Sequence, residues 1–86
     1  MDKLSINSEL KDTVDYMVHE NYKYRFIGEY YQLLIRLDRL EKVIFDAYSG
    51  QLKTQCPIKL LELQAEVMQH LLNILTIRGE IEGIKL

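Results

Sequence analysis

The chain has 86 residues, of which 48% are hydrophobic and 28% charged, and its formal net charge is −2. A chain of this size forms at most one domain and buries only about 60% of the surface exposed by its unfolded form, so partner chains are expected to add burial. The slight acidity argues against a general attraction to nucleic acid or anionic lipid. We therefore predict a single domain over 1–86 that binds neither double-stranded nucleic acid nor membranes.

The cellular setting follows from what the sequence lacks. No apolar run follows a basic start at the N-terminus, and no stretch approaches 18 uninterrupted apolar residues, so neither a signal peptide nor a membrane span is expected. The lone Cys56 has no internal disulfide partner, which fits a reducing compartment. These features predict a cytoplasmic protein.

A short amphipathic helix is predicted over about 8–20. Ser8 offers a hydroxyl as its N-cap, and Leu10, Val14 and Met17 follow at steps of four and three. Asn21 offers a break before the next helix because asparagine tolerates left-handed backbone better than most residues. A helix that continues without a break is the alternative.

The strongest helical signal covers 22–47, where six residues are spaced 4, 3, 4, 3, 4 in a heptad seam. These residues are Phe26, Tyr30, Leu33, Leu37, Leu40 and Ile44. Gly28 lies inside this helix, at a cost of about 1 kcal/mol relative to alanine. It allows close approach of another backbone or of a ligand, or else it serves packing within the protein.

A turn over 48–57 leads into a third helix over 57–82, with Pro57 suited to its first position. This helix is apolar on two neighbouring faces, and one hairpin partner can cover only one of them. The first face carries Leu60, Leu63, Val67, Ile74 and Ile81, and the second carries Leu61, Met68, Leu72 and Leu75. We therefore predict an all-α fold: a long antiparallel helical hairpin with a short N-terminal helix, assembled as a homo-oligomer.

Five residues of the helix over 22–47 share one narrow stripe at about 100° per residue. They are Arg25, Glu29, Gln32, Arg36 and Arg39. In one interpretation Arg25 pairs with Glu29, while Arg36 and Arg39 meet acids of neighbouring chains. In the other, the arginines donate to phosphates while a tyrosine ring stacks on a base.

No catalytic or metal-binding constellation is visible. His19 and His70 lack the spacing of metal ligands, and Cys56 has no identifiable base near it. The four glycines are scattered and do not form a phosphate-binding loop. We predict a protein that is not an enzyme and that uses no metal and no cofactor.

Two segments, "RFIGEYYQLLIRLDRLEKVI" and "LLELQAEVMQHLLNILTIRGEI", resemble a family of small phage hairpin proteins. This family is that of the anti-CBASS cyclic-nucleotide sponges, whose hairpin is shared with an anti-Thoeris sponge. The matching positions are Arg25, Phe26, Glu29, Tyr30, Leu33, Arg36, Leu40, Leu60, Leu61, Gln64 and Met68. Phe26 stands where methionine is expected, and the Gly-Tyr-Arg loop of one branch is missing.

The resemblance implies a homohexamer that binds cyclic di- and trinucleotides such as cGAMP without cleaving them, and thereby evades a bacterial immune defence. It places ligand pockets between protomers, with Tyr30 stacked on a base. Phosphate contacts would come from Arg25, Arg36, Arg39 and Lys42.

Two alternatives stay open at this point. Because the Gly-Tyr-Arg loop is missing, Tyr31, Tyr22 or Tyr24 could replace Tyr30 in stacking. The surplus apolar surface over 57–84 also suits a helical protein-interaction module, such as a phage adaptor or an inhibitor of a host protein.

Overall fold

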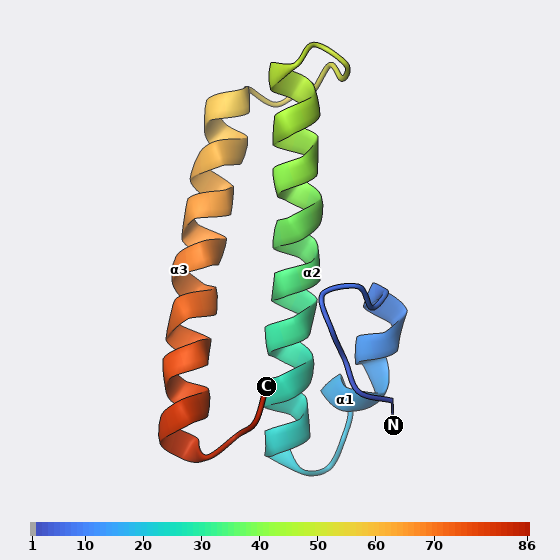
Figure 1. Ribbon diagram of the computed structural model, residues 1–86, viewed down its shortest axis with the longest axis vertical. Coiled ribbons are helices and arrows are strands. Elements are labelled where there is room, and N and C mark those ends of the chain that lie inside the picture. The colour runs from blue at the N-terminus through green and yellow to red at the C-terminus, as the bar shows by residue number, and fades with distance from the viewer. Residues whose placement is uncertain (1) are drawn as a thin grey trace.

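The structure is a computed structural model that describes residues 2–86. Its elements are the 3₁₀ helix η1 (Leu10–Thr13) and the helices α1 (Val14–Met17), α2 (Tyr22–Tyr48) and α3 (Ile58–Glu82). The long helices α2 and α3 lie side by side and run in opposite directions, while η1 and α1 pack against α2 on the side away from α3 (Figure 1). The predicted all-α class is confirmed for this part of the chain, which contains no strand.

The N-terminal helix is much shorter than the prediction of 8–20, which was wrong at both ends. Ser8 is not its N-cap, because the Ser8 hydroxyl accepts a hydrogen bond from the backbone N–H of Ser5 at 3.0 Å. Glu9 caps η1 instead, and its N–H donates to the Asp12 carboxylate at 2.8 Å. After one turn of α1 the chain leaves the helix at Val18.

The break before α2 lies at Asn21, where the sequence predicted it. The Asn21 side chain accepts a hydrogen bond from the N–H of Lys23 at 3.0 Å and is the N-cap of α2. This cap satisfies one of the free N–H groups at the start of the helix. The alternative of an unbroken helix is therefore wrong. At the start of α3, Pro57 is the N-cap and not the first helical residue, so the helix begins at Ile58, one residue later than predicted.

The main core lies between α2 and α3. Its buried side chains are Phe26, Leu33, Leu37, Leu72, Leu75 and Ile84. The chain after α3 turns back at Gly83, which has φ +70°, and the N–H of Ile84 donates to the carbonyl of Gly79 at 2.8 Å. Glycine suits this left-handed position because it has no Cβ. The turn delivers Ile84 into the core beside the start of α2.

A second group of buried residues lies where η1 and α1 meet α2, and Gly28 makes this contact possible. A Cβ on Gly28 would lie 2.9 Å from both Met17 Cγ and Tyr16 Cβ, closer than real Cβ atoms come. Tyr16 is buried here, and so is Ile35, which follows Gly28 by two helical turns. Gly28 therefore serves packing within the chain and not the approach of a ligand.

Candidate functional site

The last two arginines of the predicted stripe are exposed on α2. Arg36 and Arg39 are separated by three residues, so their side chains are neighbours on the helix surface. The stripe runs beside the N-terminal segment, since Gln32 donates to the sulfur of Met17 at 3.3 Å. Within residues 2–86 neither arginine forms a salt bridge. Both guanidinium groups are thus available to a carboxylate or phosphate from outside the protomer.

Arg25 has a different environment from the other two arginines. Its Nη1 donates to the backbone carbonyls of His19 and Glu20, both at 2.7 Å. The predicted pairing of Arg25 with Glu29 is therefore wrong, because the carbonyls left free at the end of α1 are better placed to accept from it. Arg25 fixes the connection between α1 and α2, and its contact with phosphate stays a prediction.

Lys42 lies in an acidic setting. Its ammonium pairs with the carboxylate of Asp38, one turn earlier, at 3.0 Å. Together with Glu41, Phe45 and Asp46 these two residues line a shallow cavity of about 390 Å³. Three carboxylates against one ammonium give this cavity a negative charge. The structure therefore offers no support for the predicted role of Lys42 in holding phosphate.

Tyr30 is half-buried at the edge of the α2–α3 core, and its ring packs edge-on against that of Tyr31, with ring centroids 5.0 Å apart. It precedes Arg36 by six residues and Arg39 by nine, which places the arginines about 120° to 180° around the helix from it. One protomer therefore does not bring Tyr30 and these arginines to the same ligand. A pocket that uses both needs a second copy.

The other candidate tyrosines differ in how free their rings are. Burial raises the pKa of Tyr31, with a smaller contribution from Tyr30. The ring of Tyr24 lies against that of His19, with centroids 4.3 Å apart. Tyr22 is 46% exposed, and its hydroxyl donates to the Glu82 carboxylate.

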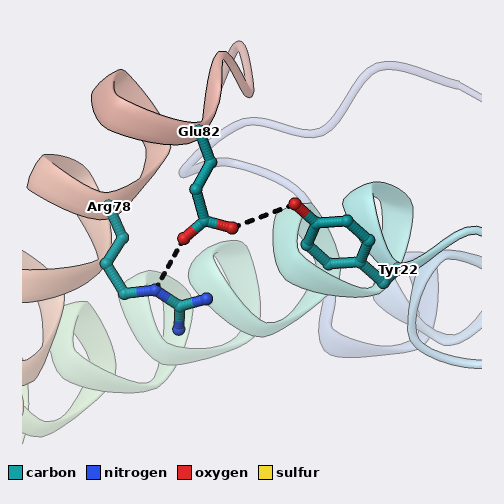
Figure 2. Close-up of polar contacts among 3 residues, drawn as sticks. All are labelled: Tyr22, Arg78 and Glu82. Atoms are coloured by element: carbon teal, nitrogen blue, oxygen red, sulfur yellow. Dashed lines mark hydrogen bonds and ion pairs between the residues drawn. The ribbon is translucent and has the colours of Figure 1, made fainter.

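Sequence reasoning missed a polar cluster at the open end of the hairpin, where α3 ends beside the start of α2 (Figure 2). The carboxylate of Glu82 accepts from Arg78 Nε at 2.9 Å and from the Tyr22 hydroxyl at 3.0 Å. The Arg78 guanidinium also lies over the Phe26 ring, 4.9 Å from its centroid. From the sequence alone, only the pairing of Arg78 with Glu82 could have been found, through their i, i+4 spacing, because Tyr22 is far away in sequence.

The cluster changes the acidity of two of its members. The hydrogen bond from Arg78, followed by that from Tyr22, lowers the pKa of Glu82 from its ordinary value of 4.5. The hydrogen bond to Glu82 raises the pKa of Tyr22 above 10.0. At neutral pH the cluster thus holds an ionised carboxylate between a cation and a neutral phenol.

This acidity predicts a stability contribution that is lost in acid. Because the pKa of Glu82 is lower in the folded state, its contribution is complete above about pH 4.5 and disappears as the pH falls through the lowered value. The melting temperature of Glu82→Gln should therefore lie slightly below that of the parent between about pH 5 and 7 and approach it in stronger acid. Glu80→Gln, which removes a carboxylate without an ion pair in the described chain, should show no such convergence. A constant difference for Glu82→Gln down to about pH 2.5 would contradict the prediction.

Helix α3 presents an exposed apolar face along much of its length. Leu60, Leu63, Val67, Ile74 and Ile81 are each more than half exposed. At the end nearest the turn, Leu60, Leu63 and Val67 also line a groove of about 470 Å³ together with Cys56 and Met68. As expected from the sequence, α2 covers only one of the two apolar faces of α3. We call the exposed face the α3 seam.

None of the helices in the described chain combines the length and apolar character that crossing a membrane requires. Residues 2–86 also contain no group of three or more His, Cys, Asp or Glu side chains that could hold a metal ion.

Comparison with known protein families gives a match over most of the chain. A family model described as Sequestin matches residues 20–81, which comprise α2, the turn and nearly all of α3. The segment with η1 and α1 lies before the match. No curated protein and no solved structure matches the chain.

Proposed function

The chain belongs to the Sequestin family, the phage anti-CBASS cyclic-nucleotide sponges, and we propose that it sequesters cyclic di- and trinucleotide second messengers. The family is one of binding proteins and not of enzymes, so the messenger would be held and not cleaved. Sequestration in the cytoplasm of the infected host cell would deprive a CBASS-type defence effector of its activator.

The observation that carries this proposal is the pair of exposed arginines, Arg36 and Arg39, which have no acidic partner in residues 2–86. Guanidinium groups donate forked hydrogen bonds that match phosphate oxygens. A charge-assisted hydrogen bond contributes about 1.5 to 3 kcal/mol, and stacking of one base on an aromatic ring contributes about 1 to 3 kcal/mol. Nanomolar binding corresponds to about 12 kcal/mol after the cost of association, so each phosphate and each base must be contacted by more than one group.

The proposal includes a homo-oligomer, with the hexamer implied by family resemblance as the expected form. The α3 seam gives one protomer an apolar surface that a second copy can cover. Tyr30 lies about 120° to 180° around α2 from the arginines, so a pocket shared by two copies would place the tyrosine of one beside the arginines of the other. Symmetry then supplies each contact twice, which suits a cyclic dinucleotide.

The proposal is tested by retention of intact ligand. The purified protein is mixed with cyclic di- and trinucleotides, including cGAMP, and filtered, and the retained fraction is denatured and assayed. We expect the ligand to be retained at micromolar protein and released unchanged. Failure to retain any of these nucleotides would contradict sequestration, and release of a cleaved product would indicate an enzyme.

The role of the stripe is tested by Arg36→Gln. Because one charge-assisted contact is lost from each of the two copies, we expect affinity for the retained nucleotide to fall more than about a hundredfold. Lys59→Gln removes the same charge from an exposed position on α3 and serves as the matched control, with affinity close to that of the parent. Equal losses in both variants would show that Arg36 acts only through overall charge.

The α3 seam also favours a second candidate function, that of a helical interaction module that grips a host protein. The mass in solution separates the two functions. A closed homo-oligomer would cover the seam with copies of the same chain, whereas a monomer would leave it free for a different protein. A monomer that retains no cyclic nucleotide would favour the second function.

A further inference from the structure

The cluster at the open end of the hairpin has the composition of a phosphate site that is already occupied by an internal anion. The Glu82 carboxylate accepts one hydrogen bond from a guanidinium and one from a phenol hydroxyl. Phosphate oxygens accept from the same two kinds of donor with similar geometry. The side chains of Arg78 and Glu82 are 48% and 27% exposed, so a ligand in solution can reach both.

The Arg78 guanidinium is positioned by its neighbours and still has nitrogens free to donate to such a ligand. Its central carbon lies over the Phe26 ring, 4.9 Å from the centroid, and only Nε is engaged by Glu82. A cation–π contact of this kind limits the movement of the guanidinium, so the side chain loses less conformational freedom on binding. Two of its nitrogens, Nη1 and Nη2, have no partner in the part of the chain that the structure describes.

The cluster also lies on the same face of α2 as the arginine stripe. Tyr22, Arg25, Glu29 and Arg36 follow one another at steps of three, four and seven residues, which places them along one side of the helix. Tyr22 is the member of this row that reaches across to α3 and touches Glu82 (Figure 2). Tyr22 and Arg36 are about 21 Å apart along the helix, so the cluster is a separate site on the same surface, with its cation contributed by the other helix.

We propose that Arg78 and Tyr22 are a further phosphate-binding pair of this protein, in which the Glu82 carboxylate occupies the phosphate position until a phosphodiester of the ligand displaces it. The proposal rests on the proposed function, since the ligand is the same class of cyclic nucleotide. An exposed ion pair of this kind contributes little to stability, so Glu82 is readily displaced. Glu82 then acts as a built-in competitor that weakens the binding of anions lacking other contacts.

Two substitutions of opposite expected sign test this assignment. Arg78→Met keeps an apolar side chain over Phe26 and removes the donor, so affinity for the cyclic dinucleotide retained by the parent should fall about tenfold. Glu82→Gln removes the competing charge, so affinity should rise about threefold. The matched controls are Lys59→Met and Glu80→Gln, which make the same charge changes on α3 outside the cluster and should leave affinity within about twofold of the parent.

The opposite signs separate a binding role from a structural one. If the cluster were only a clasp between α2 and α3, both Arg78→Met and Glu82→Gln would break it and both would weaken binding. Loss of affinity in Glu82→Gln, or an effect no larger than that of Glu80→Gln, would overturn the inference while leaving sequestration intact. A parent protein that retains no cyclic nucleotide would instead overturn the proposed function on which the inference rests.

Discussion

The double substitution Val67→Glu with Ile74→Glu is expected to convert the proposed homo-oligomer into a monomer of 10.2 kDa. These side chains lie seven residues apart on the α3 seam and are 59% and 53% exposed in the protomer. Covering a side chain of this size contributes about 1.5 to 3 kcal/mol, and burying an unpaired carboxylate in its place is costly. Association should weaken more than a hundredfold, as measured by light scattering or sedimentation.

The same variant should lose cyclic-nucleotide retention, since Tyr30 and the arginines of one protomer lie on different sides of α2. The control is Gln69→Glu with Asn73→Glu, which adds two negative charges to exposed polar positions of the same helix. That protein should keep both the mass and the ligand of the parent. Circular dichroism should show equal helix content in all three proteins. An unchanged mass in the Val67/Ile74 variant would contradict assembly through the seam.

Alanine at Gly28 is expected to lower the free energy of unfolding by about 2 kcal/mol, although it improves the helix propensity of α2. Propensity alone would favour alanine by about 1 kcal/mol. Against this, the new Cβ would lie 2.9 Å from two side-chain carbons of α1 and 3.0 Å from the backbone nitrogen of Met17. Overpacking against such a neighbour costs about 1 to 3 kcal/mol, and here part of the neighbour is backbone.

Gly79→Ala is the matched comparison, because Gly79 is also a buried glycine inside a long helix. Its added Cβ would meet the flexible end of Leu86 at 3.2 Å and the carbonyl oxygen of Ile84 at 3.3 Å, both longer than the contacts at Gly28. We expect a change within about 0.5 kcal/mol of zero, since propensity and crowding nearly cancel. Urea unfolding measures the free energy of unfolding of both variants. Hydrogen exchange should show residues 10–17 opening first in Gly28→Ala. Equal stabilities of the two variants would refute the contact assigned to Gly28.

The open-end cluster and the stripe give the candidate surface two sources of positive charge in a protein that is acidic overall. Arg36 is exposed on α2, while Arg78 comes from α3 and is positioned by Phe26. The net charge alone therefore does not argue against the proposed phosphate-bearing ligand. Local donors in fixed geometry decide whether phosphate binds, and the charges elsewhere on the chain affect this only weakly through solvent and salt.

The sequence by itself determined the two long helices and the apolar faces of α3, because these depend on periodicity and on local capping. The heptad through Phe26, Leu33 and Leu37 marked the α2 face that became the core. Helix boundaries at Tyr22 and Ile58 were within one residue of the structure, owing to Asn21 and Pro57. The family was also readable from local motifs in these helices.

Only the tertiary structure decided the contacts between residues far apart in the chain. Arg25 had a plausible acidic partner four residues along the chain. It donates instead to backbone carbonyls that are free because α1 ends earlier than the sequence predicted. Glu82 and Tyr22 meet because Gly83 and Ile84 anchor the end of α3 beside the start of α2. A side chain forms a hydrogen bond with the partner that folding brings within reach. In this hairpin, the partners at its open end are set by how the end of α3 packs against the start of α2.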